Sequence, residues 1–262
     1  MSRAAAGCYV ISLRPVGAHA PMRRAAVRIG ARVLALSPWR IAPRDDAATR
    51  RALAAALAAD VVLFTSPAAV RAATGLLRLR ARRGQVWCAV GAGTAAALRR
   101  AGIADVQAPT RMDSEGLLAL PVLQALRGRS VGLVTAPGGR GTLAPALAQR
   151  GARVLRADIY ARVPVRPSPV ACARLRDLRA RPWVAVGSGE ALALLLAALP
   201  PEDAARLRAA RVVAASERLR TLARAQGFAG DGVVAASARP GDLLAAVQAA
   251  GRHSTRRRQA SR

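Results

Sequence analysis

Four hydroxyl side chains stand where an apolar, strand-like run gives way to a helical pattern, and they are well placed to do chemistry. They are Ser66, Thr94, Ser188 and Ser216. A hydroxyl at such a place can act as a nucleophile, bind an anion together with the first amides of the helix, or cap that helix. Spacing alone leaves the three roles open.

A nucleophilic hydroxyl needs a general base, and the chain offers few. Its only histidines are His19 and His253, and the second lies in a polar segment, so a Ser-His-Asp or Cys-His centre would depend on His19 alone. The three cysteines, Cys8, Cys88 and Cys172, lie among apolar residues and are expected to be buried, unreactive thiols. No His, Cys and carboxylate residues have metal-ligand spacing. The sequence therefore disfavours triad and metal chemistry.

Two glycine-rich stretches could approach an anion closely. In residues 135–142, "TAPGGRGT", Gly138 and Gly139 allow close approach of the backbone and Arg140 adds a planar cation. This segment is either an anion-binding loop or a plain strand-to-helix turn. Residues 91–96, "GAGTAA", lack the third glycine of a dinucleotide-binding loop, and neither stretch has the Gly-Lys-Ser/Thr of a P-loop. No nucleotide cofactor is expected.

The charge of the chain predicts an anionic ligand without identifying it. The 262 residues include 42 basic and 14 acidic residues, a net charge of +28, and every basic residue is arginine. Such a surface attracts polyanions. Aromatic residues make up only 3 %, which disfavours a nucleic-acid surface built on base stacking, whereas a small polycarboxylate or phosphate fits. The basic segment 251–262 is expected to be a disordered tail.

No segment predicts membrane insertion or export. The longest apolar run, residues 191–199, is far shorter than the roughly 20 residues needed to span a bilayer. The first residues show no signal-peptide cleavage pattern. The chain is therefore expected to be a cytoplasmic protein without a membrane partner.

Short β-rich runs alternate with helical segments rich in alanine and leucine, the pattern of an α/β fold with parallel sheets. The runs that predict strands are residues 8–12, 32–36, 60–65, 86–91, 130–135, 153–163, 182–187, 211–216 and 232–237. Helices are expected after most of these strands, and several should end at a glycine such as Gly30 or Gly151.

One α/β pattern occurs twice along the chain. The matching pairs, about 122 residues apart, are residues 30–34 with 151–155, Cys8 with Ser130, Ser66 with Ser188, and Thr94 with Ser216. In a parallel sheet the carboxyl ends of the strands and the N-termini of the helices share one edge, where ligands bind. Two similar units with hydroxyls at this edge favour a shared anion-binding role that also caps the helices.

Two extended, proline-bounded segments, residues 35–43 and 155–165, are candidates for a two-strand linker between the units. Tyr160, one of two tyrosines, lies in the second segment. Its phenol could face a ligand, or its ring could pack at a hinge, and spacing does not decide between these roles.

Taken together, these segments resemble the uroporphyrinogen-III synthase family from about Val10 to Gln248. The pieces that carry the resemblance by their order and spacing are "LRPVG", "LFTSPAAV", "VGAGTAAALRRAGI", "SEGLLALPVL", "GGRGTLAPALAQRGARV", "IYARV", "GSGEAL" and "ERLRTLARAQGF". The chain departs from the family pattern at Gly187, where a hydroxyl is missing before Ser188, and at residues 214–217, where a glycine-and-threonine turn is replaced.

The resemblance implies two Rossmann-like or flavodoxin-like parallel-sheet domains joined by a two-strand linker, with one domain inserted in the other. The first domain would combine residues 1–35 with 165–250. The second would comprise residues 42–156, and residues 36–41 and 157–164 would be the linker strands.

The resemblance also implies an activity, the cyclisation of hydroxymethylbilane to uroporphyrinogen III with loss of water and inversion of ring D, without metal or organic cofactor. Tyr160 matches the family's tyrosine and would act as proton donor or orienter. The substrate-binding residues would be Arg14, Ser66, Thr94, Ser114, Gly138, Gly139, Arg140, Ser188 and Ser216. A monomer in transient contact with hydroxymethylbilane synthase is expected.

A different class of function stays open from the residues alone. The chain could be a non-catalytic two-domain α/β protein that binds a polyanionic ligand, or nucleic acid, in a basic cleft. Such a protein would bind its ligand saturably without closing a ring. Binding to nucleic acid would depend steeply on salt.

Overall fold

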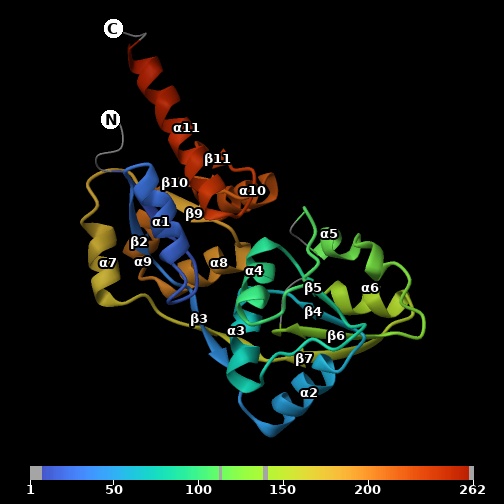
Figure 1. Cartoon of the computed structure of the whole chain (residues 1–262). Helices are drawn as coiled ribbons and strands as arrows, with labels where there is room; N and C mark the ends of the chain where they lie inside the picture. Colours follow the sequence, from blue (N-terminus) through green and yellow to red (C-terminus); the bar gives the residue numbers. More distant parts are fainter. Residues whose placement is uncertain (1–7, 112–113, 138–140, 260–262) are drawn as a thin grey trace. The chain divides into compact units, whose positions relative to one another are not determined.

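The chain folds as two compact units, one inserted in the other. The computed structural model describes residues 8–111, 114–137 and 141–259. Unit 1 comprises Met1–Arg40 with Val163–Arg262, and unit 2 comprises Ile41–Arg162 (Figure 1). This confirms the predicted class, an α/β fold of two parallel-sheet domains with one domain inserted in the other.

Unit 1 contains a five-stranded parallel sheet in the order β11-β10-β9-β1-β2. Its strands are β1 (Tyr9–Ser12), β2 (Arg32–Ala35), β9 (Trp183–Val186), β10 (Arg211–Ala214) and β11 (Val233–Val234). Its helices are α1 (Ala20–Arg28), α7 (Pro169–Arg176), α8 (Gly189–Ala198), α9 (Pro201–Arg208), α10 (Glu217–Ala225) and α11 (Pro240–Gln259). Every residue of β9 is buried, as expected of a central strand covered by helices on both faces.

Helix α11 belongs to unit 1 and is longer than the sequence suggested. Leu243, Leu244 and Val247 pack its first half into the core that also contains Met22 of α1. The helix then continues to Gln259, into the segment that was expected to be a disordered tail. No helix in the described ranges is long and apolar enough to cross a membrane.

Unit 2 contains a four-stranded parallel sheet in the order β5-β4-β6-β7. Its strands are β4 (Val61–Phe64), β5 (Val86–Ala89), β6 (Ser130–Thr135) and β7 (Arg153–Asp158). Its helices are α2 (Ala47–Leu57), α3 (Pro67–Leu76), α4 (Ala92–Arg100), α5 (Ser114–Leu118) and α6 (Leu143–Gln149), with a 3-10 turn at Pro121–Leu123.

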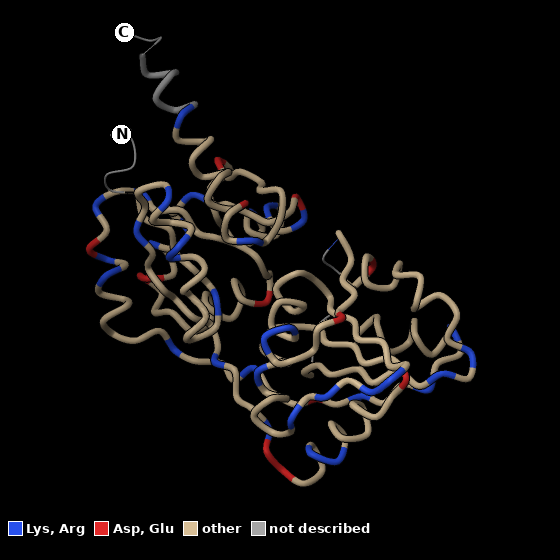
Figure 2. The backbone as a smooth tube through the Cα atoms, in the orientation of Figure 1, with Lys and Arg blue, Asp and Glu red and all other residues tan. Residues whose placement is uncertain are grey.

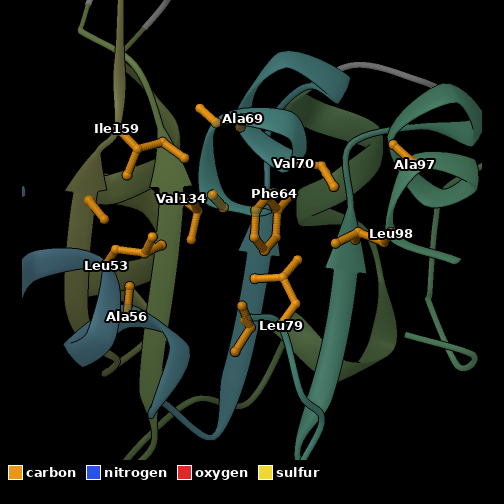
Figure 3. Close-up of a cluster of buried hydrophobic side chains, with 14 of the residues drawn as sticks. Leu53, Ala56, Phe64, Ala69, Val70, Leu79, Ala97, Leu98, Val134 and Ile159 are labelled. Carbon is orange, nitrogen blue, oxygen red and sulfur yellow. The ribbon is translucent and has the colours of Figure 1, made fainter. Parts of the chain in front are cut away.

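The side chains of β4 show why its apolar run is continuous. Val62 and Phe64 point into one core cluster, whereas Val61 and Leu63 belong to a second cluster on the opposite face. Figure 3 shows Phe64 at the centre of the first cluster, and its ring stacks on Trp87 with 5.9 Å between centroids. Both faces are covered, so β4 holds the segment after it at a fixed place on the edge of the sheet.

The sheet topology confirms the internal repeat and corrects its register. Strands β9, β1 and β2 neighbour one another as β4, β6 and β7 do, with β10 at the place of β5. A parallel bridge from Cys88 to Gln107 stands where β11 pairs with β10. In the ladders Tyr9 pairs with Arg32 as Ser130 pairs with Arg153. Tyr9 is therefore the counterpart of Ser130, and the predicted match of Cys8 with Ser130 is off by one residue.

The two extended segments also pair. β3 (Trp39–Pro43) and β8 (Tyr160–Pro164) form a separate two-stranded sheet, and the chain passes from one unit to the other through it. The run predicted as one strand over residues 153–163 is two strands, β7 and β8, with Ile159 between them. Trp39 and Tyr160 begin the two paired strands, and both are buried.

Glycines end the helices that precede β2 and β7, as predicted. Gly30 follows α1 with φ 67°, and Gly151 follows α6 with φ 85°. This left-handed conformation is strained for residues that carry a Cβ atom. The two glycines occupy the same place in the two units, which again supports the duplication.

Candidate functional site

Ser66 joins a helix cap to the predicted tyrosine. It follows β4 and is the N-cap of α3, where its Oγ accepts a hydrogen bond from the Ala69 amide at 3.0 Å. The same Oγ lies 3.0 Å from the Tyr160 hydroxyl. The predicted position of Ser66 at a strand end and helix start is confirmed, and Tyr160 lies beside it.

A second hydroxyl pair lies next to the first. The Thr65 hydroxyl donates to the Thr135 hydroxyl at 2.8 Å, and the Thr65 amide donates to the Val134 carbonyl at 3.2 Å. These contacts join the ends of β4 and β6, the two central strands of unit 2. Hydroxyls from two strands therefore gather at the carboxyl edge of the sheet.

A cavity of about 200 Å³ opens at this edge, and polar groups provide much of its lining. Its hydroxyl-bearing residues are Thr65, Ser66, Ser114, Thr135, Thr142 and Tyr160, and its basic residues are Arg156 and Arg162. None of the described residues that line it is a histidine or a carboxylate. Ser66 thus lacks a general base in this cavity, so the site favours binding of an anion over nucleophilic catalysis.

The two arginines of the cavity lie on β7 and β8. Arg156 donates from Nε to both carboxylate oxygens of Asp158 at 3.1 Å, and from Nη2 to the Ala136 carbonyl at 3.4 Å. Asp158 thus offsets much of its charge. Arg162 lies two residues after Tyr160 on β8, and side chains two apart on a strand project to the same face. Both line the cavity.

The predicted equivalence of Thr94 and Ser216 is wrong. Ser216 is the N-cap of α10, and its Oγ accepts from the Leu219 amide at 3.4 Å. In unit 2 the N-cap of the matching helix α4 is Gly91, whereas Thr94 lies in its first turn and is 2 % exposed. The match was wrong because the cap of α4 is a glycine, which has no hydroxyl to mark the cap position in the sequence. Thr94 does not line the cavity of unit 2.

The other predicted ligands fall in three places. Ser188 in unit 1 is the N-cap of α8, and its Oγ accepts from the Ala191 amide at 3.3 Å, matching Ser66. Ser114 begins α5 and lines the cavity of unit 2. Gly138, Gly139 and Arg140 lie outside the described residues, whereas Gly141 and Thr142, which come next, line the cavity.

Arg14 lies just beyond β1 in unit 1 and is half-buried. Its Nε is buried and has no hydrogen-bond partner in the part of the chain that the structure describes. Burial lowers the pKa of this guanidinium. Nearby, the His19 ring bonds to two serine hydroxyls of unit 1. His19 is thus engaged within unit 1.

The other potentially reactive side chains are the three cysteines. Cys88 and Cys172 are buried, Cys8 is half-buried, and all three are free thiols. Burial raises the pKa of Cys88 to about 12, so this thiol stays protonated. Among the described residues, no three His, Cys, Asp or Glu side chains come together as metal ligands.

Basic residues are spread over both units. Figure 2 shows basic residues along the backbone of both units rather than in one segment. The cavity of unit 2 is therefore marked by its hydroxyls and its place at the sheet edge, more than by charge. Fold and site together define a two-unit α/β protein with a strand-edge cavity suited to an acidic small molecule.

Comparison with known proteins identifies the class more closely. The chain matches the family described as "Uroporphyrinogen-III synthase HemD" over residues 20–245. The structure is similar to a mutant uroporphyrinogen III synthase of the thermophilic bacterium Thermus thermophilus, with 21 % identity over 93 % of this chain and 98 % of that chain, and a TM-score of 0.56. It is also similar to the Helicobacter pylori uroporphyrinogen-III synthetase, with 13 % identity over 92 % and 99 % of the two chains and a TM-score of 0.61.

The family match covers most of the chain, and the solved structures share its fold. The chain therefore belongs to the uroporphyrinogen-III synthase family, the cyclising lyases of tetrapyrrole biosynthesis. This confirms the resemblance drawn from the sequence and, with it, the cyclising lyase activity of the family.

Sequence reasoning missed part of the cavity. Thr65, Thr135, Arg156 and Arg162 line it but were not predicted as ligands. Thr135 ends a predicted strand just as Thr65 does, so its strand-end position was an available signal. Arg162 was signalled by its place two residues after Tyr160. The pairing of β4 with β6, which brings the threonines together, is a tertiary contact with no local signature.

Proposed function

We propose that the cavity of unit 2 binds the acetate and propionate groups of one pyrrole ring of hydroxymethylbilane. We further propose that Tyr160 assists departure of the hydroxyl group of this substrate. The observation that carries this proposal is the 3.0 Å contact between the Tyr160 hydroxyl and Ser66 Oγ at a cavity without carboxylates among its described lining residues. Acetate and propionate groups are met there by hydroxyl donors and by the N-terminus of α3.

The hydrogen bonds around Ser66 determine where the phenol proton can go. The Ala69 amide already donates to Ser66 Oγ, so the Ser66 hydroxyl proton is free to point toward Tyr160. When Ser66 donates to the Tyr160 oxygen, the phenol proton is directed elsewhere and can be given to the substrate. The same bond from Ser66 stabilises the phenolate that results.

The chemical steps follow from this proton. Protonation of the hydroxymethyl oxygen on ring A lets its C–O bond break, and water leaves with both bonding electrons. The resulting azafulvene is attacked by the substituted carbon of ring D, and the spiro product fragments and recloses with ring D inverted. Loss of a proton from the ring D carbon restores the aromatic pyrrole, and return of this proton to the phenolate regenerates the Tyr160 phenol. The net change is loss of one water.

Orientation is the larger part of the task. The uncatalysed substrate closes without inversion, so the protein must hold one geometry of a flexible polyanion. Fixing reacting groups in a productive arrangement can supply several kcal/mol of barrier reduction. Hydroxyls and amides are suited to this because they bind carboxylates without one fixed positive charge for each.

The other predicted ligands come from both units. Ser114 lines the same cavity as Ser66, and Ser188 and Ser216 cap helices at the corresponding edge of unit 1. Arg14 follows β1 at that edge. We assign these residues to the carboxylates of the remaining rings.

The setting of the enzyme is also part of the proposal. We expect a cytoplasmic monomer that receives its substrate by transient contact with hydroxymethylbilane synthase. Sedimentation should then give a mass near 27.1 kDa. Adding the synthase should raise the yield of the inverted isomer without a stable complex on gel filtration.

The test of the proposed role is the isomer formed by matched variants. Hydroxymethylbilane made in the assay is supplied to the wild type and to Tyr160→Phe and Ser66→Ala. The proposal expects the wild type to yield isomer III and both variants to form it more slowly. If both variants keep the wild-type rate of isomer III formation, the cavity of unit 2 is not where the chemistry occurs.

A further inference from the structure

Arg14 occupies, in unit 1, the place that Thr135 occupies in unit 2. In the β1–β9 ladder Ser12 pairs with Ala185, so the register continued by two residues sets Arg14 opposite Gly187. In the β4–β6 ladder Phe64 pairs with Val134, which sets Thr65 opposite Thr135. The hydroxyl pair of unit 2 is therefore replaced in unit 1 by an arginine and a glycine.

This replacement changes the kind of anion contact that the edge offers. In unit 2 Thr65 and Thr135 bond to each other at 2.8 Å and present neutral donors. In unit 1 Gly187 has no side chain, and the site has a guanidinium instead. Residue 188 after this glycine is the cap of α8, whose ten residues give it a full helix N-terminus. A cation and a helix N-terminus thus lie at one sheet edge.

His19 anchors the loop that carries Arg14. Its Nδ1 lies 2.9 Å from Ser12 Oγ, and its Nε2 lies 2.8 Å from Ser37 Oγ. Ser12 ends β1, Ser37 follows β2, and His19 is the last residue before α1. The ring therefore ties together the ends of two strands and the start of a helix. The loop from Leu13 to Ala18, which contains Arg14, connects the end of β1 to His19.

The ring that makes this bridge is uncharged at neutral pH. A neutral imidazole donates from one nitrogen and accepts at the other, which suits two hydroxyls that can each do either. The ring is 5 % exposed, and the charged groups that act on it are Arg14 and Arg23. Burial and these two cations lower the pKa of His19 to about 4. At neutral pH the bridge adds no charge beside the guanidinium.

We propose that Arg14 and the N-terminus of α8 form a carboxylate subsite in unit 1, and that His19 is the positioning residue that holds Arg14 in place for it. The subsite would take an acetate or propionate group of the linear tetrapyrrole, and in this it rests on the proposed function. Its contact pairs the carboxylate with a guanidinium, so that donor and acceptor both carry a charge, whereas the hydroxyls of Thr65 and Thr135 in unit 2 are uncharged donors.

The experiment is a double-mutant cycle on KM. Initial rates of isomer III formation are measured for the wild type, Arg14→Gln, His19→Ala and the variant with both changes. Arg14→Gln should raise KM about tenfold or more, since a hydrogen bond to a charged group is lost. His19→Ala should raise KM severalfold when Arg14 is present. It should have no effect on KM in the variant that already carries Arg14→Gln.

Conservative variants separate positioning from folding. His19→Asn keeps a donor and acceptor near Nδ1 for Ser12, and His19→Gln keeps them near Nε2 for Ser37. At least one of them should restore KM toward the wild-type value, and the cycle can be run with these variants if His19→Ala does not fold. Arg28→Gln, which removes an exposed charge at the end of α1, is the matched control and should leave KM within about twofold.

The outcomes are distinct. If replacement of His19 changes KM by the same factor with and without Arg14, or changes only the melting temperature, the positioning role is overturned while the proposed function stands. If Arg14→Gln leaves KM unchanged, the subsite itself is overturned. If the wild type forms only isomer I, the proposed function fails and this subsite fails with it.

Discussion

The hydroxyl oxygens of Ser66 and Tyr160 lie 3.0 Å apart, although 94 residues separate them in the chain. Ser66 is held by its cap contact with the Ala69 amide, and Tyr160 begins β8 with a ring that is 3 % exposed. A buried ring fixed at one end and a capped hydroxyl at the other leave little freedom in this contact. The pair is therefore preorganised rather than two independent surface groups, and this arrangement supports the proton-donor role that we propose for Tyr160.

Replacement of Tyr160 tests its proposed role as proton donor. Tyr160→Phe should lower kcat about tenfold to a hundredfold without abolishing turnover, because orientation of the substrate by the other contacts persists. KM should change little. Steady-state rates of isomer III formation at saturating substrate provide the measurement. Unchanged kinetics in a correctly folded variant would remove Tyr160 from the mechanism.

Replacement of Ser66 separates its two roles. Ser66→Ala should cost about 1 kcal/mol of stability through the lost cap and should also lower kcat through the lost contact with Tyr160. Ser168 caps α7 with a similar bond to the Ala171 amide at 3.2 Å. Ser168→Ala should therefore show the same loss of stability with kcat intact. Equal kcat for the two variants would reduce Ser66 to a helix cap.

A buried carboxylate in unit 1 makes a prediction about folding alone. Asp203 is 0 % exposed and accepts from Arg176 Nη1 at 3.2 and 3.3 Å. Arg176→Ala leaves this charge buried and unpaired, which should cost about 3–5 kcal/mol in urea denaturation. Adding Asp203→Asn to that variant should recover part of the loss, since no charge then remains.

Glu202 provides the control for that prediction. It also contacts Arg176, at 3.1 Å, but its side chain is 73 % exposed. Glu202→Ala should therefore change stability by less than about 1 kcal/mol. Equal losses for Glu202→Ala and Arg176→Ala would show that burial of Asp203 does not determine the cost.

His19 makes stability depend on pH in a defined window. The pKa of His19 is lowered from 6.5 in the unfolded chain to about 4 in the folded chain. Between pH 6.5 and about pH 4, His19 is therefore protonated in the unfolded chain and neutral in the folded chain. The contribution of His19 is fully present above pH 6.5 and is lost as the pH falls toward 4. The loss should amount to roughly 3 kcal/mol at most.

Urea denaturation at about pH 7 and about pH 4.5 measures this slope. The pKa values of Asp46 and Asp60 are lowered from 3.8, so the stability that these carboxylates contribute is lost mainly below pH 3.8. They therefore contribute little to the change in stability between about pH 7 and about pH 4.5. His19→Gln should flatten the pH dependence. The same loss of stability in His19→Gln as in the wild type would place the titrating group elsewhere.

Much of the fold could be predicted because the central strands of its two sheets are buried on both faces. Runs such as residues 61–64 are apolar throughout, since Val61 and Leu63 pack on one side and Val62 and Phe64 on the other. The duplication was visible for the same reason, because matching cores require matching apolar runs.

The register of the duplication was harder to predict. The strand runs at residues 8–12 and 130–135 are apolar on both faces and show no alternation, so they align almost equally well one residue apart, which explains the shift at Cys8. Gly91 caps α4 through its backbone, so the nearest hydroxyl, Thr94, was mistaken for the counterpart of Ser216. A cap without a side chain has no hydroxyl to signal it in the sequence.

The site was only partly predictable for a related reason. Ser66 and Tyr160 were identified, the first from its strand-end position and the second from the family resemblance. Their contact, and the meeting of Thr65 with Thr135, arise from strand pairing between distant segments. The bridge from His19 to Ser12 and Ser37 depends in the same way on three separate elements.

Identification of the product isomer tests the central claim most directly. Porphobilinogen and hydroxymethylbilane synthase generate the linear tetrapyrrole, the protein is added, and the uroporphyrin isomers are separated after oxidation. Our interpretation predicts that isomer III predominates and that its fraction rises with the amount of protein added. Formation of isomer I alone, at ample concentrations of folded protein, would contradict it.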